Sequence, residues 1–486
     1  MNRERERDRE RDWEDWEMVI GLEVHCELAT RTKLFCGCPN RFGDEPNTNV
    51  CPVCLGLPGS LPVLNEQVVE LSMRLGRALH CTVRRSVFAR KNYFYPDMPK
   101  DYQISQYDLP INVDGWLELP SGPRVGIERA HIEEDTGKSI HVGGGGRITE
   151  AGYSLVDYNR AGVPLLEIVS APDLRSSDDA RTYVTELRAI LLATGSSDAK
   201  MEEGSLRVDA NVSVHRSGEP FGTRCEIKNL NSLRSLGRAI EYEAKRQIEM
   251  IDAGDAVRQE TRHWNEADGR THTLRVKEEA EDYRYFPEPD LVPLDPGDEW
   301  VGRIDAAMPA LPADRRAALS DAAGAAAGDR AVAIAVERGL DGLALEAIAA
   351  GADPVRVLTH VEHNLAVDGA EGLDPVKLAA LVAMETSGEL TPTQAKAVLA
   401  ELVATGEDPA AIAKAKGYEA MGADALGGAV DEVIAANAEQ WTRFVEGDDK
   451  VRGNLTRFFV GQVMKATKGQ ADGKAVTVLL RERAGI

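Results

Sequence analysis

Four cysteines form two close pairs near the start of the sequence. One residue separates Cys36 from Cys38, two separate Cys51 from Cys54, and twelve lie between the pairs. Two close pairs of thiols joined by a short loop are typical of a tetrahedral zinc site. Four thiolates would fill the coordination sphere, so the spacing predicts structural zinc, the alternative being four reduced, buried cysteines. The remaining cysteines lack such a spacing and are predicted to be small core residues: Cys26, Cys81 and Cys225.

Carboxylates and a histidine recur in segments with the composition of strands. Glu23 and His25 are two residues apart and would share one face of a strand, where they can bind a metal or transfer protons. Glu133, Glu134 and Asp135 are consecutive, and adjacent acids often simply face solvent. They become a predicted magnesium site if the fold brings them opposite Glu23 and His25, because Mg²⁺ prefers carboxylate and water oxygens.

The clearest strand pattern in the chain covers residues 206–214. Apolar residues alternate there with Arg207, Asp209 and Asn211, so a period of two places the polar set on one face. Glu202 lies shortly before this strand. A sheet face with acids, an arginine and an asparagine suits a magnesium–nucleotide site better than an apolar ligand, although the wet side of an antiparallel sheet has the same composition.

Two aromatic segments stand out in a chain that is only 5% aromatic. Residues 91–97 and 282–288 combine tyrosine and phenylalanine with Lys91 and Arg284, a composition that can stack bases or line a nucleotide pocket. Packing at junctions between loops and strands would give the same composition. A phosphate loop ending at residues 136–139 is excluded, because position 132 is isoleucine where that motif requires glycine.

The chain of 486 residues has a formal net charge of −23, with the acids spread along its length. This charge argues against nucleic-acid binding through the electrostatic field of the whole protein. It is typical of adaptation to high salt, which we favour over an acidic regulatory tail. Residues 450–486 are the exception, because eight Lys or Arg and two acids give them a charge of +6. This segment predicts a contact with a polyanion such as tRNA, ordinary helix surface charge being the alternative.

The order of helices and strands predicts an α+β fold. Residues 1–17 form a charged extension, and strand-rich sequence with turns follows to about residue 295. Helices are predicted within it at Glu66–Leu79, Ser177–Thr194 and Ser232–Ala253. Alanine-rich helical sequence then continues from about residue 298 to the end. No apolar run approaches the roughly 20 residues needed to span a bilayer, and no secretory signal is present, so we expect a cytoplasmic protein without membrane contacts.

Short segments distributed along the chain resemble the B subunit of the tRNA-dependent amidotransferase family, GatCAB. They are Gly21–His25, Arg90–Asp97, Tyr102–Gln106, Glu133–Ser139, Asp157–Arg160, Leu165–Val169, Lys200–Arg207, Glu226–Ser232 and Asp282–Asp290. The resemblance runs from about Met18 to the end, and residues 460–469 are similar to the family's tail domain. The related archaeal E subunit carries a large extra domain before its helices, whereas helices follow Asp290 closely here, which favours the B subunit.

The resemblance implies a domain order and a reaction. It implies an antiparallel cradle domain over 18–295 with a zinc-binding segment at 36–54, a helical domain over 298–407, and a YqeY-like, tRNA-binding tail over 408–486. The implied reaction uses ATP to phosphorylate the side-chain carboxylate of Asp-tRNA(Asn) or Glu-tRNA(Gln), and ammonia then displaces the phosphate. The implied partners are an A subunit that releases ammonia from glutamine and a small C subunit, in a heterotrimer.

The resemblance also implies roles for individual residues. It makes Glu23, His25 and Glu134 the expected magnesium ligands, with structural zinc at the four cysteines. Around the same face it implies further active-site residues: Glu133, Asp135, Glu202, Arg207, Asp209 and Asn211. Lys91 and Arg284 are expected to hold phosphate. Contact with tRNA is expected from the basic tail residues Arg452, Arg457, Lys465 and Lys468.

Two other interpretations of the sequence compete with this one. A nonenzymatic zinc-ribbon protein that binds RNA would explain the cysteines and the basic tail, but not the polar strand or the acids at 133–135. An amidase that makes its own ammonia would need a nucleophile, and the chain lacks a serine-rich amidase segment. Cys26 follows His25 directly, so in a strand their side chains would point to opposite faces. The sequence does not choose between Asp-tRNA(Asn) and Glu-tRNA(Gln).

Overall fold

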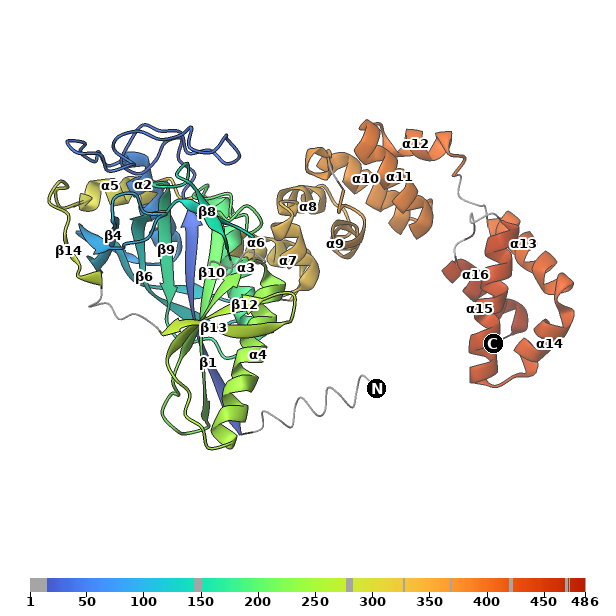
Figure 1. Cartoon of the computed structure of the whole chain (residues 1–486). Coiled ribbons are helices and arrows are strands. Elements are labelled where there is room, and N and C mark those ends of the chain that lie inside the picture. The colour runs from blue at the N-terminus through green and yellow to red at the C-terminus, as the bar shows by residue number, and fades with distance from the viewer. Residues whose placement is uncertain are drawn as a thin grey trace. The chain divides into compact units, whose positions relative to one another are not determined.

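The computed structural model describes residues 15–143, 151–276, 283–326, 328–367, 369–418, 423–467, 471 and 473–485. The chain divides into two compact units, of which the first ends at Pro312 and the second begins at Ala313. The first is built on a large sheet, and the described part of the second is helical (Figure 1). Among the described residues, none of the helices combines the length and the apolar character that a membrane crossing requires.

A large, mostly antiparallel sheet forms the first unit. Its order is β13-β12-β11-β10-β1-β9-β6-β4-β3-β14, and β5 joins it at β6 and pairs with β2. The strands are β1 (Trp16–Glu27), β2 (Thr82–Val83), β3 (Val87–Asn92), β4 (Tyr102–Leu109), β5 (Asn112–Glu118), β6 (Arg124–Glu134), β9 (Pro164–Ser170), β10 (Leu206–Arg216), β11 (Cys225–Leu230), β12 (Glu260–Asn265), β13 (Arg270–Val276) and β14 (Phe286–Pro287). The predicted strand at residues 206–214 is confirmed as β10, and it pairs with β11 in antiparallel fashion.

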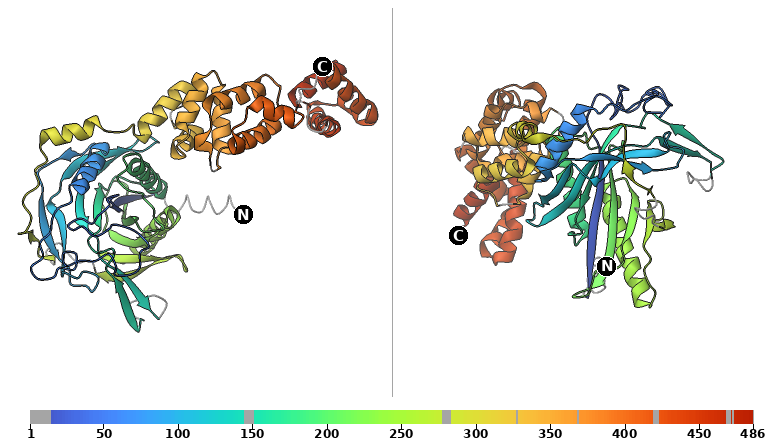
Figure 2. Two further views of the ribbon diagram at one scale, coloured as in Figure 1. Left: turned by 90° about the horizontal axis from the view of Figure 1, so that it is seen from above. Right: turned by 90° about the vertical axis from the view of Figure 1, so that its left-hand side faces the viewer.

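A separate two-stranded hairpin projects from this sheet (Figure 2). It consists of β7 (Lys138–Val142) and β8 (Tyr153–Asp157), with Ile140 paired to Leu155. Residues 144–150, which connect the two strands, lie outside the described residues.

Three helices of the first unit pack on one face of the sheet. They are α2 (Glu66–Ala78), α3 (Ser177–Ala193) and α4 (Leu233–Asp252), and they agree with the predicted bounds to within one residue at each end. Each begins at a side chain that accepts a hydrogen bond from a first-turn amide: Asn65, Ser176 and Ser232. Their apolar sides share one continuous core with β1 and β10.

The sheet has one apolar and one polar face, as the alternation in the sequence predicts. In β10, Leu206, Val208 and Ala210 are buried in the core, whereas Arg207 and Asp209 are only partly buried. β1 follows the same rule, with Leu22, Val24 and Cys26 in the core and Glu23 and His25 on the other side. The other two cysteines predicted to be core residues, Cys81 and Cys225, are also buried. The three helices cover the apolar face, so the polar side chains lie on the other face of the sheet.

The first helix after the composition change belongs to the first unit. α5 (Gly297–Ala306) packs against α2, and Arg77 Nε donates to Asp305 Oδ1 at 2.8 Å. Ile304 is buried in the core of the sheet unit. The structural division therefore falls at Pro312, later than the sequence-based boundary near 295–298.

The described residues of the second unit form two helical cores. The first is built from α6 (Pro312–Ala323), α7 (Arg330–Glu337), α8 (Asp341–Ala349), α9 (Pro354–His363), η3 (Ala370–Gly372), α10 (Pro375–Thr386), α11 (Pro392–Thr405) and α12 (Pro409–Ala415). The second is built from α13 (Ala423–Ala436), α14 (Ala438–Glu446), α15 (Asp449–Ala466) and α16 (Gly473–Ala484). Ile412 of α12 still belongs to the first core, so the change of core follows α12 rather than residue 407. The predicted α+β class with a helical C-terminal region is confirmed.

Candidate active site

The polar sheet face gathers side chains from neighbouring strands. In the antiparallel register of β1 and β10, His25 lies opposite Arg207 and Glu23 lies opposite Asp209. Directly paired residues point to the same face, so the two strands place both polar sets together. Asn211 Nδ2 donates to Glu23 Oε1 at 2.9 Å. The structure thus brings together five of the residues selected from the sequence.

A group of potential metal ligands lies at the centre of this face. His25 Nε2 is 3.8 Å from Glu133 Oε1 and 3.5 Å from Glu167 Oε2. One ligand atom from each residue lies within 4.8 Å of the others. The residues come from β1, β6 and β9, with β9 in the middle, and we call them the carboxylate–histidine triad. One imidazole and two carboxylates are a donor set that suits a divalent cation.

Neighbouring charges and burial shift the pKa values of the triad residues. Burial disfavours the imidazolium of His25, but the hydrogen bond and charge of Glu167 outweigh it, and together with Glu133 and Asp209 they raise the pKa of His25 to about 9. Burial and the charge of Glu167 raise the pKa of Glu133 to about 7. His131 faces Glu167 in the register, and burial lowers its pKa to about 4, so its ring is neutral at pH 7. Without a cation, a protonated His25 therefore partners Glu167.

Glu134 does not join His25, contrary to the magnesium set that the resemblance implies. It follows Glu133 directly in β6, and adjacent strand residues point to opposite faces. Its carboxylate is paired with Lys100 and accepts a hydrogen bond from Ile104 N at 2.9 Å. Glu167 takes the place expected for Glu134.

Asp135 fixes the arginine at the end of the polar face. Arg207 Nη2 donates to Asp135 Oδ2 at 2.7 Å, and Arg160 Nε lies 3.4 Å from the same oxygen. Glu27 lies nearby, and burial together with the charge of Asp135 raises the pKa of Glu27 to about 7, a value suited to proton transfer near neutrality. A fixed cation therefore stands beside a carboxyl group that can exchange a proton.

Lys228 lies at the opposite end of the polar face. Lys228 Nζ lies 2.6 Å from Asp209 Oδ2 and 3.1 Å from Glu226 Oε1. Glu202, in contrast, is exposed in the turn before β10 and lies outside the strand face.

The aromatic segments meet beside the triad. Lys91 Nζ is 4.7 Å from the ring centroid of Tyr283, and its charge lowers the pKa of Glu133 against the effect of burial. Tyr107 and Tyr285 stack with centroids 4.6 Å apart. Arg284 is exposed, and its carbonyl accepts a hydrogen bond from Asn92 at 2.9 Å. The charge of Lys91 therefore reaches Glu133 of the triad, whereas Arg284 is exposed to solvent.

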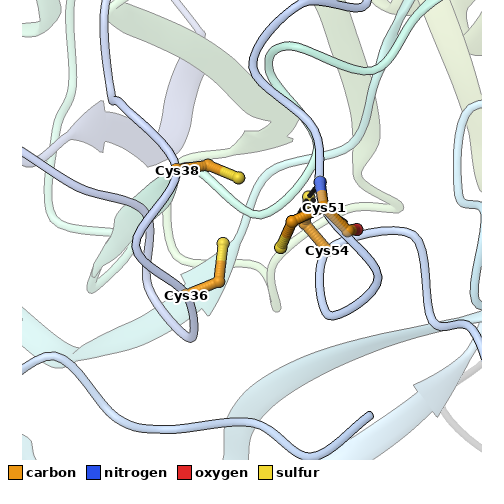
Figure 3. A group of neighbouring side chains, drawn as sticks. All are labelled: Cys36, Cys38, Cys51 and Cys54. Carbon is orange, nitrogen blue, oxygen red and sulfur yellow. Dashed lines mark hydrogen bonds between the residues drawn. The ribbon is translucent and has the colours of Figure 1, made fainter.

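The four cysteines come together in one group, and all four side chains point inward (Figure 3). Their sulfurs lie within 4.8 Å of one another, and the Cys51 and Cys54 sulfurs are 3.9 Å apart. Zinc–sulfur bonds of about 2.3 Å in a tetrahedron would separate the sulfurs by about 3.8 Å. The donor set and its geometry fit a four-coordinate zinc ion.

The basic tail residues differ in their surroundings. Arg457 and Lys465 are exposed on α15. Arg452 is directed at the end of α14, where its Nη2 donates to Val445 O at 2.9 Å and its Nε to Phe444 O at 3.3 Å. Lys468 lies outside the described residues.

Sequence reasoning missed three residues of the polar face: Glu27, Glu167 and Lys228. Glu167 is the most important of them. Because β9 is buried on both faces, polar and apolar residues do not alternate around Glu167, so no pattern marks it. Glu167 and Lys228 do fall within segments that carry the family resemblance, and this was the signal available for both.

Comparison with known proteins identifies the family. The GatB/GatE catalytic domain family matches residues 18–302, and the GatB domain family matches residues 357–483. The chain is 50% identical to the B subunit of the aspartyl/glutamyl-tRNA(Asn/Gln) amidotransferase of Frankia casuarinae, over 97% of this chain and 96% of the relative. It is 49% identical to the protein of the same name from Salinispora arenicola, over 97% of each chain. For that of Moorella thermoacetica the identity is 48%, over 96% of this chain and all of the relative. The chain therefore belongs to the family of amidotransferase B subunits that contain the GatB/GatE catalytic domain.

Proposed function

We propose that this chain activates and amidates the side-chain carboxylate of Asp-tRNA(Asn), Glu-tRNA(Gln) or both, as the names of its relatives indicate. The observation that carries the proposal is the triad of His25, Glu133 and Glu167 on the polar face beside Arg207. Cation ligands next to a fixed guanidinium suit phosphoryl transfer, which depends on positioning and charge stabilisation.

The chemistry proceeds in two steps because a carboxylate is a poor electrophile. A carboxylate oxygen of the substrate attacks the γ-phosphorus of ATP, the bond to ADP breaks, and an acyl phosphate forms. Ammonia then attacks the carbonyl carbon, phosphate leaves with the bonding electrons, and the nitrogen loses its extra proton. Glu27, with a pKa of about 7 and outside the triad, is suited to receive that proton.

The triad fits Mg²⁺, which when bound would neutralise charge on the transferring phosphoryl group. His25, Glu133 and Glu167 would hold it. Arg207 is kept beside it by Asp135, and its guanidinium would face oxygens of the phosphoryl group or the substrate carboxylate. Lys91 would contribute a second positive charge, with Arg284 reaching phosphate from the outer edge.

The rest of the polar face would orient the substrate. Glu23 and Asn211 are hydrogen-bonded to each other, and Asp209 is paired with Lys228. Glu23 and Asp209 would offer carboxylate oxygens to the ammonium-bearing end of the aminoacyl ester.

The other parts of the chain would support this site. Zinc at Cys36, Cys38, Cys51 and Cys54 would be structural, since four thiolates leave no open position. Arg457 and Lys465 would contact the tRNA backbone as part of the basic tail. A glutaminase A subunit would supply ammonia, and a small C subunit would complete a heterotrimer. With a role in translation, we expect the chain in the cytoplasm.

An amidation assay tests the proposal and names the substrate. The chain is combined with its A and C partners, ATP, Mg²⁺ and ammonium, and each misacylated tRNA is supplied in turn. We expect Asn-tRNA or Gln-tRNA to form only with ATP, and His25→Ala to abolish product while tRNA binding persists. No product from either tRNA, with a folded wild-type protein that binds tRNA, would instead support a zinc-bearing RNA-binding scaffold.

A further inference from the structure

Hydrogen bonds tie the four-cysteine segment to a turn that lies far away in the sequence. The turn comprises residues 157–162, and we call it the bracing turn. Asn47 N donates to Asp157 Oδ1 at 2.9 Å, and Asn47 Oδ1 accepts from Tyr158 N at 2.8 Å. Asn49 N donates to Asn159 Oδ1 at 2.8 Å, and Asn159 Nδ2 donates back to Glu45 O at 2.7 Å. These are bonds across about 110 residues of chain, so they fix a tertiary contact.

The start of the cysteine segment reaches the same turn from its other side. Leu34 N donates to Gly162 O at 2.9 Å, and the fully buried Lys33 donates from Nζ to Tyr158 O at 3.2 Å. Gly162 has a φ of +81°, and a Cβ atom built there would lie 3.5 Å from Cys54 Cβ. Cys54 of the four-cysteine group therefore packs directly behind the bracing turn.

The bracing turn in turn holds Asp135. Gly162 N donates to Asp135 O at 2.9 Å, and Asp135 N donates to Val163 O at 2.8 Å. Arg160 donates to Thr136 O at 2.9 Å and lies 3.4 Å from the Asp135 carboxylate. Both the backbone and the side chain of Asp135 are thus set by this turn.

Asp135 connects the turn to the active-site face in two ways. Its carboxylate accepts the 2.7 Å hydrogen bond from Arg207, and it follows Glu133 by two residues at the end of β6. A shift of the turn would therefore move Arg207 through a side chain and Glu133 through the backbone. Active sites lose function when such supports place a group even about 1 Å away from its position.

We propose that the four-cysteine segment positions the active-site face, acting through the bracing turn, with Asn47, Asn159 and Arg160 as positioning residues. Metal binding by the cysteines fixes the segment, and the segment fixes the turn that holds Asp135. The inference rests on the proposed function of the triad, so its test measures cation binding by the triad separately from turnover.

The experiment compares Mn²⁺ binding by full-length variants, using electron paramagnetic resonance of the free ion. Asn159→Ala removes the bonds to Asn49 and Glu45, and Asn159→Asp keeps the acceptor but loses the donor. Thr48→Val is the matched control, because Thr48 Oγ1 bonds within the segment, to Glu45 O at 2.6 Å. Glu167→Gln assigns the Mn²⁺ signal to the triad. Zinc content is measured on every sample, and hydrogen exchange follows the amides of β6.

We expect Asn159→Ala to retain zinc but to bind Mn²⁺ about fivefold more weakly than the wild type. The backbone amides of β6 should exchange hydrogen faster in this variant. Asn159→Asp should show smaller changes, and Thr48→Val should show none. Removing zinc from the wild type should weaken Mn²⁺ binding to a similar degree, and removing it from Asn159→Ala should add little, because the two changes act on one path. Wild-type Mn²⁺ affinity in a zinc-bearing Asn159→Ala, or an equal loss in Thr48→Val, would overturn the inference. If the wild-type chain bound no Mn²⁺ at the triad, the proposed cation site itself would fall, and the inference with it.

Discussion

His25 Nε2 lies 3.5 Å from Glu167 Oε2, and the two residues are direct partners in the antiparallel register of β1 and β9. The pair depends on strands that are far apart in the sequence, so each side chain reaches the other only in the folded sheet. A cation bound here would have to displace the proton that His25 holds, because only a neutral imidazole can ligate.

Glu167→Gln should therefore damage the site more than any exposed acid on the neighbouring strand. The change removes a charged ligand but keeps the shape of the side chain. We expect Mn²⁺ affinity to fall at least about tenfold and ATP-dependent amidation to be lost, with tRNA binding unchanged. Glu128→Gln is the control, since Glu128 is exposed on β6. Equal Mn²⁺ affinity in the two variants would remove Glu167 from the cation site.

Cys38→Ser should release the zinc ion. The substitution removes one of four ligands, and we expect loss of one equivalent of zinc per chain and a decrease in melting temperature of about 5 °C. Zinc content by mass spectrometry and thermal unfolding provide the measurements. Cys81→Ser serves as the control, because Cys81 is a buried cysteine outside the group, and it should retain zinc. Full zinc occupancy in Cys38→Ser would contradict the predicted coordination.

The second unit should lose stability in acid because of one buried histidine. Asn364 Nδ2 lies 3.0 Å from His360 Nδ1, and His360 Nε2 lies 2.9 Å from Glu385, which fits a neutral ring that accepts at Nδ1 and donates at Nε2. Burial lowers the pKa of His360 despite the carboxylate of Glu385. The unfolded chain therefore binds the proton more readily, so the contribution of His360 is complete above its unfolded pKa of about 6.5 and is lost as the pH falls below it.

Urea unfolding from pH 7.5 to 5.5 measures this effect. His360→Gln should flatten the pH dependence, whereas His363→Gln, which alters an exposed histidine three residues away, should leave it as in the wild type. Parallel curves for all three proteins would show that His360 does not titrate as argued.

Removing exposed charges on α15 should weaken tRNA binding in a salt-dependent manner. Arg457→Ala with Lys465→Ala should reduce the slope of log K against log salt by about one to two units, because each phosphate contact releases a counterion. Arg483→Ala is a suitable control, since the Arg483 guanidinium donates to both carboxylate oxygens of Asp431. A filter-binding titration at several salt concentrations measures the slope. An unchanged slope would place the tRNA contact elsewhere.

The net charge of −23 should make the protein more stable in salt. Added ions screen repulsion among the carboxylates, so we expect the melting temperature to rise between 0.1 and 2 M KCl. Thermal unfolding across this range tests the expected adaptation to high salt, and a flat or falling curve would speak against it.

Local sequence patterns predicted the individual helices and strands better than the contacts between distant segments. Alternation along residues 206–214 identified the polar face of β10, and the predicted bounds of α2, α3 and α4 agree with the structure to within one residue. These signals are local, because each depends on neighbours within one turn of helix or a few residues of strand. The position of α5 could not be read in this way, since Arg77 and Asp305 meet across 228 residues.

The composition of the candidate site was only partly predictable for the same reason. Glu23 and His25 were assigned to one face correctly, but three consecutive acids gave no sign of which one would meet His25. Period two separates Glu133 from Glu134, and only the register of β6 with β9 decides which of them faces His25. Glu167 lies in a strand buried on both faces, where no alternation marks it.

The adjacency of Glu133 and Glu134 makes β6 sensitive to length as well as to composition. Inserting or deleting one residue between Arg129 and Glu133 would shift the register of the strand by one residue. Glu134, the partner of Lys100, and Glu133, the partner of His25, would then point to the opposite faces of the sheet. Both carboxylates would still be present, yet each would meet the wrong neighbour. A point substitution in this strand alters one of the two contacts, whereas a one-residue change in its length alters the neighbours of both carboxylates.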